Sequence, residues 1–229
     1  MVLTIGGNDP DGCAGIAADL RTFFALGVHG CPVITAATSQ NTRDYFNSFA
    51  ISPQSIASQL NSVFSDLRID AVKVGLVVGE GNVEAVAKSL RKWKAKNIVL
   101  DPVMTSQPGT KKLINKQTIR AIAKHLVPLA TLSTPNLEEA RALTNCKKPK
   151  QAAKKLSEMG AKNIVITGIV RGKRIYDLAL INKNFTEYEK KKIKTSTHGG
   201  GCVFSSAIAA NIAKRMNLRK AVENAESFI

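Results

Sequence analysis

The sequence has few cysteines, few aromatic residues and no long apolar run, and each shortage excludes a class of protein. Its 4 cysteines show neither the paired spacing of metal ligands nor the density of a disulfide scaffold, so we expect a reducing, cytoplasmic setting. The apolar runs are short and interrupted by charges, which argues against a membrane-spanning helix. The N-terminus lacks the basic start and cleavage site of a signal peptide, so no secretion is expected.

Acidic residues are also scarce, because 33 lysines and arginines face only 17 aspartates and glutamates, for a formal net charge of +16. Such an excess attracts anions, from nucleotides to nucleic acids. Much of it, however, lies in the lysine-rich runs 147–150, 154–155 and 190–194, which contain no aromatic residues. With 1 Trp, 3 Tyr and 8 Phe, the chain is not expected to stack bases or to bind nucleic acid. We interpret the runs as solvated surface.

Short apolar segments alternate with longer segments of helical spacing along the whole chain. The predicted strands are 2–5, 31–37, 71–74, 97–100, 132–134, 163–167 and 176–181, and the predicted helices are 14–26, 53–64, 83–93, 119–126, 137–143 and 152–159. This alternation predicts an α/β fold of three αβα layers, with a mostly parallel central sheet covered by helices on both faces. No linker is long enough to separate domains, so we expect a single domain over residues 1–229.

Polar and glycine-rich segments follow the predicted strands, where open α/β sheets bind their ligands. The segments are Gly6-Gly7-Asn8-Asp9, Gln40-Asn41, Gly75-Leu76, Asp101-Pro102 and Pro135-Asn136. We therefore expect one site at this edge of the sheet.

The most informative of the glycine-rich segments is Thr197-His198-Gly199-Gly200-Gly201-Cys202, which precedes an apolar helix. Glycines allow a sharp turn that directs several N–H groups toward one point, at the positive end of the helix. Cys202 falls in the first helical turn, where the dipole favours a thiolate. The alternative is a buried structural cysteine beside a tight turn. An anion cradle beside an acid–base group suits phosphoryl transfer to a hydroxyl.

A second glycine-rich turn, residues 6–19, leads from the first strand into a helix. It has neither the Gly-Lys-[Ser/Thr] ending of a Walker A loop nor a G-x-G-x-x-G pattern, which argues against the two commonest nucleotide motifs. Asp19 lies one turn into this helix, where it would accept hydrogen bonds from a polar ring in the crevice. The alternative is that Asp19 only complements the helix dipole.

Asn136 and Glu139 are three residues apart at the start of a predicted helix. The pair suits Mg²⁺ held through its water shell, with Asp101 as a further candidate for the metal and phosphate zone. The same spacing also fits a capping box, in which the two side chains bond the helix start. The residues alone favour the capping box.

Several motifs in this order closely resemble one family over nearly the whole chain. They include Gly7-Asn8-Asp9-Pro10, Gln40-Asn41-Thr42, Lys73-Val74-Gly75, Asp101-Pro102-Val103-Met104, Thr134-Pro135-Asn136-Leu137-Glu138-Glu139 and the segment 197–202. Together they resemble the hydroxymethylpyrimidine/phosphomethylpyrimidine kinases of thiamine biosynthesis, within the ribokinase-like superfamily. The resemblance implies that ATP, with Mg²⁺, phosphorylates 4-amino-5-hydroxymethyl-2-methylpyrimidine and then its monophosphate.

The resemblance also implies roles for individual residues. Cys202 would be the base near the attacking oxygen, and Gly199, Gly200 and Gly201 would form the anion hole. The residues implied at the pyrimidine are Asp19 and Gln40 as hydrogen-bond partners, with Gly7, Ala14, Leu76 and Val103 as the pocket lining. Those implied at Mg·ATP are Asp101, Asn136, Glu139 and Thr167, with Asp101 and Glu139 at the metal, through water. A homodimer is also implied.

The chain departs from the family pattern at four places. Leu76 replaces a frequent Met, and Gly200 replaces a Thr within the glycine run. Thr167 occupies the position of a phosphate-contacting lysine, so the second transfer would need another lysine, such as Lys173. The chain ends within an apparent helix at Ile229, as expected of a trimmed form or of the kinase part of a longer polypeptide.

Three alternatives remain open from the sequence. One is a pyridoxal kinase of the same superfamily, and another is a non-catalytic pyrimidine-binding regulator on the same scaffold. A nucleic-acid binder that uses the basic surface is the third, and its affinity would fall steeply with salt.

Overall fold

A single mixed sheet forms the centre of the computed structural model, which describes residues 1–106, 111–190 and 199–229. The strands are β1 (Val2–Asn8), β2 (Gly30–Gln40), β3 (Tyr45–Ala50), β4 (Ala71–Val74), β5 (Ile98–Leu100), β6 (Leu132–Ser133), β7 (Ile164–Arg171), β8 (Arg174–Ile181) and β9 (Asn184–Lys190). Their order in the sheet is β3-β2-β1-β4-β5-β6-β7-β8-β9. The neighbouring strands β2, β1, β4, β5, β6 and β7 pair in parallel. The pairs β3 with β2, β7 with β8 and β8 with β9 are antiparallel.

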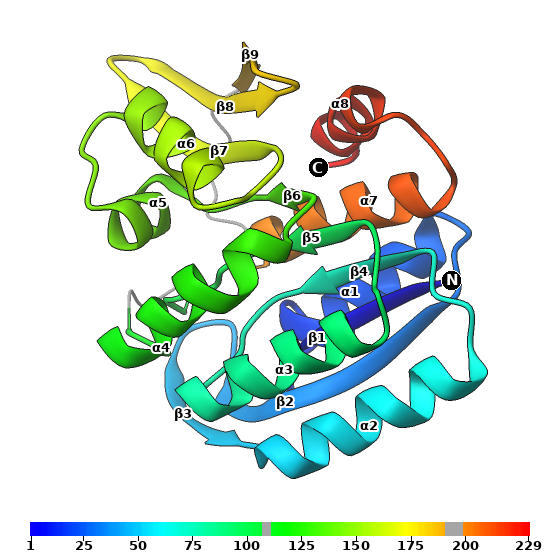
Figure 1. Ribbon diagram of the computed structural model, residues 1–229. Helices are drawn as coiled ribbons and strands as arrows, with labels where there is room; N and C mark the ends of the chain where they lie inside the picture. Colours follow the sequence, from blue (N-terminus) through cyan, green and yellow to red (C-terminus); the bar gives the residue numbers. More distant parts are fainter. Residues whose placement is uncertain (107–110, 191–198) are drawn as a thin grey trace.

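Helices cover both faces of this sheet (Figure 1). They are α1 (Gly15–Ala25), α2 (Pro53–Asp66), α3 (Glu80–Lys92), α4 (Lys116–Ala121), α5 (Leu137–Thr144), α6 (Pro149–Glu158), α7 (Gly200–Ala213) and α8 (Leu218–Phe228). One apolar core lies between the sheet and α2 to α6, and a second core lies between the sheet and α1, α7 and α8. The predicted αβα layering is confirmed.

Local sequence explains why several elements begin and end where they do. Ser52 caps α2, because its side chain accepts a hydrogen bond from the Ser55 N–H, and Pro53 occupies the first helical position. β4 is buried on both faces and is apolar except for Lys73, as is typical of a central parallel strand. A buried lysine in such a strand requires a partner of opposite charge, which is described with the site below.

The structure adds two strands that the sequence pattern did not predict, β3 and β9. Both are partly exposed edge strands in which polar residues interrupt the apolar ones, so they lack the continuous apolar run by which a buried strand is recognised. The helix predicted over 119–126 is also more irregular than expected. α4 ends at Ala121 and continues as a π-helical turn, Ile122–Leu126, and a 3₁₀ turn, Val127–Leu129.

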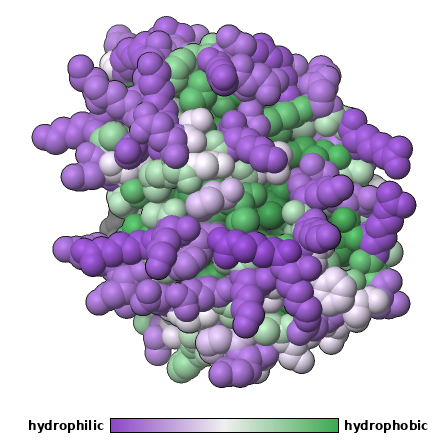
Figure 2. Space-filling view, viewed as in Figure 1, coloured by the Kyte–Doolittle hydropathy of each residue, from purple (hydrophilic) through white to green (hydrophobic). Residues whose placement is uncertain are grey.

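The lysine runs 147–150 and 154–155 are exposed at the start of α6 and along it, which agrees with their interpretation as solvated surface. Figure 2 shows hydrophilic side chains over most of the visible face, with apolar side chains in a band between them. Lys191 to Lys194, Thr197 and His198 lie outside the described residues. Within the described ranges, none of the helices has the length and apolar character needed to cross a membrane.

Candidate active site

A cavity of about 260 Å³ lies at the carboxyl ends of the parallel strands, where the sequence predicted a site. Its described lining comes from β1 and the loop between β1 and α1, from β2 and β4, and from the loops after β4 to β6. The starts of α1, α5 and α7 and the bulge of β7 complete it. The predicted residues that line it are Gly7, Ala14, Gln40, Leu76, Asp101, Val103, Asn136, Glu139, Thr167, Gly199, Gly200, Gly201 and Cys202. Asp19 is the one predicted site residue outside this lining.

The glycine run forms the start of α7, as predicted. Gly199 has a left-handed backbone (φ 83°), and a Cβ atom there would lie 1.9 Å from the Cys13 carbonyl oxygen. Only glycine therefore allows this close approach of the two loops. The first N–H groups of α7, those of Gly200, Gly201 and Cys202, have no partner within the helix and lie at its positive end. Such N–H groups are suited to an anion, and they lie beside the Cys202 side chain.

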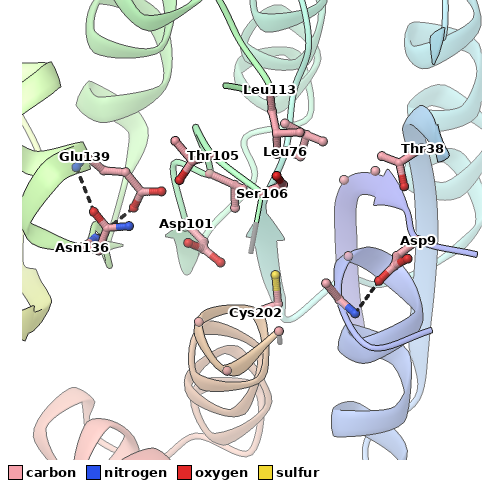
Figure 3. Close-up of a pocket in the computed structure, with 18 of the residues that line it drawn as sticks. Asp9, Thr38, Leu76, Asp101, Thr105, Ser106, Leu113, Asn136, Glu139 and Cys202 are labelled. Carbon is pink, nitrogen blue, oxygen red and sulfur yellow. Dashed lines mark hydrogen bonds between the residues drawn. The ribbon is translucent and has the colours of Figure 1, made fainter. Parts of the chain in front are cut away.

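The charge state of Cys202 differs from the expected thiolate. Burial and the nearby carboxylates of Asp101 and Asp19 raise the pKa of the thiol to about 12, although Lys73 and the Gly15 N–H lower it. The helix dipole therefore does not prevail over desolvation, and the ligand-free protein holds a neutral thiol. In Figure 3 the sulfur points from the start of α7 into the cavity.

The loop between β1 and α1 packs against the glycine run and is held by Asp9, whose role the sequence did not reveal. The Asp9 carboxylate accepts hydrogen bonds from the Ala14 N–H at 2.8 Å and from the Asp11 N–H at 3.2 Å. Gly15 also has a left-handed backbone, and a Cβ atom there would lie 2.2 Å from the Gly7 carbonyl oxygen. Hydrogen bonds and a close backbone approach thus connect the wall that contains Gly7 and Ala14 to the start of α1.

Asp19 is fully buried, which differs from the expected contact with the substrate. Its carboxylate oxygens each lie 3.0 Å from the Lys73 ammonium, and they accept hydrogen bonds from Thr4 Oγ1 at 2.6 Å and Ser206 Oγ at 2.7 Å. We call these four residues the Asp19 cluster. The alternative of simple dipole complementation does not describe Asp19 either, because its partner is a buried cation. The sequence missed this pairing because Lys73 is distant along the chain.

The opposite side of the cavity is an acidic wall made by Asp101, Asn136 and Glu139 (Figure 3). Asn136 and Glu139 form the capping box of α5, since the Asn136 side chain accepts from the Glu139 N–H and the Glu139 carboxylate accepts from the Asn136 N–H, both at 2.9 Å. The same carboxylate also accepts from the Met104 N–H at 3.2 Å. The capping box and the position in the cavity wall are therefore compatible.

The two carboxyl groups of the acidic wall have little positive charge nearby to offset their own negative charge. Burial, followed by the charge of Asp101, raises the pKa of Glu139 to about 8. Burial also raises the pKa of Asp101, although Lys73 and the Ser205 hydroxyl lower it. Two neighbouring buried carboxyl groups, both with raised pKa values, suit a cation that would offset their negative charge. Within the described part of the chain, no cluster of three or more His, Cys, Asp or Glu side chains could hold a metal by itself.

Thr167 reaches the cavity from a bulge of β7. The pairing of β7 with β8 shifts between Ile166 and Ile169, the Thr167 N–H donates to the Pro135 carbonyl at 2.9 Å, and the Gly168 N–H donates to the buried Asp177 carboxylate at 2.9 Å. Lys173, the suggested substitute for the missing lysine, lies in the exposed turn between β7 and β8 and is not part of the described lining.

Comparison with known proteins shows to which family the chain belongs. Residues 9–229 match the family described as phosphomethylpyrimidine kinase. The chain belongs to the phosphomethylpyrimidine kinase family. It is therefore a kinase, as the motifs predicted.

Two curated members of the phosphomethylpyrimidine kinase family illustrate the similarity. The hydroxymethylpyrimidine/phosphomethylpyrimidine kinase of Escherichia coli is 37% identical over 235 residues, which cover 99% of this chain and 88% of the relative. A bifunctional thiamine biosynthesis protein of Geobacter sulfurreducens is 36% identical over 236 residues, which cover 100% of this chain and 48% of the relative.

Solved structures agree with the fold. The phosphomethylpyrimidine kinase of Clostridium difficile superimposes with a TM-score of 0.89 at 32% identity, covering 100% of this chain and 96% of the other. A pyridoxal kinase of Bacillus subtilis in complex with ADP gives a TM-score of 0.90 at 34% identity, covering 100% and 89%. The predicted α/β kinase fold is confirmed.

Proposed function

We propose that the chain transfers the γ-phosphoryl group of ATP to the hydroxymethyl oxygen of 4-amino-5-hydroxymethyl-2-methylpyrimidine, and then phosphorylates the monophosphate to give the diphosphate. Each transfer releases ADP, and the first also releases the proton of the hydroxyl. The observation that best supports this proposal is the position of the α7 start. It lies between a wall of small and apolar residues and the acidic wall, where a hydroxyl and a phosphate would meet.

On the first of these sides, the aminopyrimidine would bind between Leu76 and Val103, with Gly7 and Ala14 leaving room for a flat ring. Gln40 at the end of β2 offers both an amide donor and an acceptor, which matches an aminopyrimidine edge. Asp19 does not take part in this contact in our proposal, because the Asp19 cluster occupies its carboxylate.

At the start of α7, the exposed N–H groups of Gly200 to Cys202 would stabilise the transferred phosphoryl oxygens. The Cys202 side chain would orient the hydroxyl and, once its own proton has been lost to solvent, accept the hydroxyl proton late as a thiolate. A loose phosphoryl-transfer transition state needs little early deprotonation, so the thiolate is required only late in the transfer, although the thiol is neutral in the free protein.

The acidic wall fits Mg²⁺, since this ion prefers carboxylate oxygens and keeps several waters. Asp101 and Glu139 would hold it, directly or through water. Bound there with ATP, Mg²⁺ would supply positive charge to the phosphate oxygens. Asn136 keeps Glu139 in place through the capping box, and Thr167 offers a hydroxyl to the nucleotide phosphates.

Phosphorus NMR of the products formed from the pyrimidine alcohol and Mg·ATP tests the proposal. A phosphate monoester followed by a diphosphate is the expected result. A monoester alone would limit the proposal to the first transfer, which is the outcome that Thr167 in place of a lysine would produce. Absence of any phosphate ester, with tight pyrimidine binding, would overturn the proposal in favour of a non-catalytic regulator.

Pyridoxal kinase activity is a second candidate, because pyridoxal kinases superimpose on this chain as well as a phosphomethylpyrimidine kinase does. Steady-state comparison of the two alcohols separates the candidates. We expect a higher kcat/KM for the aminopyrimidine because Gln40 matches its polar edge. A clear preference for pyridoxal would reverse the assignment.

A further inference from the structure

Lys73 is a buried cation at the cavity to which neither the motifs nor the proposed mechanism assigns a role. Its side chain is 1% exposed, and it is the one lysine or arginine among the described residues that line the cavity. The ammonium lies 3.0 Å from the Asp19 carboxylate and 3.9 Å from Asp101 Oδ2. It therefore lies between the Asp19 cluster and the acidic wall.

The surrounding sequence makes room for this ammonium. A Cβ atom at Gly75 would lie 2.8 Å from Lys73 Nζ and 3.5 Å from Lys73 Cε. Gly75 does not have a left-handed backbone, so the conformation of the chain does not require glycine there. The contact with Lys73 does, because any larger residue would displace the ammonium.

Two consecutive serines of α7 fix the two carboxylates around Lys73. Ser206 Oγ donates to Asp19 at 2.7 Å, and Ser205 Oγ donates to Asp101 at 3.0 Å. Both serines follow Cys202 within the same helix, so the position of α7 and the positions of both carboxylates are connected. Burial alone would lower the pKa of Lys73, but the charge of Asp19 above all, together with that of Asp101, outweighs burial and raises this pKa. Lys73 is thus a permanent cation.

We propose that Lys73 is a positioning residue for phosphoryl transfer, whose ammonium, 3.9 Å from Asp101 Oδ2, holds the Asp101 carboxylate in place for the nucleotide. Lys73 acts through Asp101 and not on the pyrimidine. Without it, Asp101 and Glu139 would be buried carboxyl groups with no described cation among the lining residues, and the Asp101 carboxylate would leave its present position. A displaced Asp101 would bind Mg·nucleotide less well. This inference rests on the proposed kinase function.

Gly75→Ala is the gentlest test, because the added methyl group displaces the flexible end of Lys73 and leaves every charge in place. We expect the affinity for Mg·ADP, measured by calorimetry, to fall about 10-fold, and kcat to fall with it. The Kd for the pyrimidine should stay within about threefold of the wild type. Gly81→Ala in α3 is the matched control, since its Cβ atom would lie 3.4 Å from Pro53 Cγ, away from the cavity.

The charge-neutral double variant Lys73→Met/Asp19→Asn is the stronger test. It removes both members of the buried pair, so no uncompensated charge remains between them. We expect Mg·ADP affinity and kcat to fall about 10- to 100-fold while pyrimidine affinity is retained. A purely structural role predicts lower thermal stability with unchanged kcat and Mg·ADP affinity in both variants, and that result would overturn the proposal.

The outcomes for Lys73 are separable from those for the proposed function. A wild-type protein that forms no phosphate ester contradicts the proposed function, whatever Lys73 does. Mg·ADP affinity still reports on Lys73 in that case. If the double variant fails to fold, Gly75→Ala alone decides, and equal Mg·ADP affinities in Gly75→Ala and Gly81→Ala would reject the positioning role.

Discussion

The Asp19 cluster and the acidic wall share Lys73, but they balance their charges in different ways. In the Asp19 cluster, one carboxylate is bonded by an ammonium and two hydroxyl groups, so charge and hydrogen bonding are both satisfied. In the acidic wall, Asp101 and Glu139 have raised pKa values and share too little positive charge. From this comparison we propose that Asp101, whose charge is incompletely compensated, serves ligand binding, whereas the fully bonded Asp19 serves the structure.

The largest expected effect concerns Cys202 at the start of α7, which belongs neither to the Asp19 cluster nor to the acidic wall. Cys202→Ala should lower kcat by about 10²- to 10⁴-fold, because it removes the group that orients and deprotonates the hydroxyl. Pyrimidine binding, measured by calorimetry, should be largely unchanged. Cys146→Ala, at a half-buried position after α5, is the control and should keep the wild-type kcat. Near-normal turnover of the Cys202 variant would refute its role.

Replacing one aspartate at a time tests the comparison directly. Asp19→Asn leaves Lys73 buried without its main partner, and it should lower the free energy of unfolding by about 3–5 kcal/mol. Asp101→Asn should cost much less stability, because it removes a charge that is already poorly compensated, but it should strongly weaken Mg·ADP binding. Urea unfolding and calorimetry measure the two effects. Equal stability losses in the two variants would contradict the distinction between the Asp19 cluster and the acidic wall.

The pKa of Glu139 predicts how stability depends on pH without Mg²⁺. Its value of about 8 in the folded protein exceeds the ordinary value of 4.5, so the folded state binds the extra proton between these pH values. The stability from this group is therefore fully present below pH 4.5 and is lost as the pH rises to 8. The loss within this window is about 1.4 kcal/mol per pH unit.

Glu139→Gln is the variant that isolates this effect, since the amide cannot ionise. Urea unfolding between pH 5 and pH 8, on the order of three pH units, should show a smaller decline for the variant than for the wild type. Parallel declines would mean that Glu139 is already ionised in the folded protein. The negative charge of the acidic wall would then be better compensated than we infer.

The smallest expected effect compares the consecutive serines of α7. Ser206→Ala removes a hydrogen bond to the fully buried Asp19, which should cost about 1–3 kcal/mol in the free energy of unfolding. Ser205→Ala should cost less, because Asp101 lies at the cavity, where water can replace the hydroxyl. Thermal unfolding of the two variants provides the measurement. A larger loss for Ser205→Ala would reverse the ranking of the two regions.

The sequence predicted the layers of the fold and most of the cavity lining, because both depend on local patterns. The start of α7, the capping box of Asn136 and Glu139, and the polar residues after each strand are recognised from neighbours in the chain. The protonation state of the Cys202 thiol and the burial of Asp19 depend on residues that only the fold brings together. The one available signal was Lys73, a charged residue within the apolar strand β4. The homodimer and the cytoplasmic location remain predictions.

The most direct test of the account is a crystal structure of the protein with the pyrimidine alcohol and a non-hydrolysable Mg·ATP analogue. We predict that the metal lies at Asp101 and Glu139, directly or through water, and that the hydroxymethyl oxygen lies within hydrogen-bond distance of the Cys202 sulfur. The Asp19 carboxylate should remain bonded to Lys73. A complex in which Asp19 leaves Lys73 to bind the pyrimidine, or in which the metal lies away from Asp101, would contradict the account.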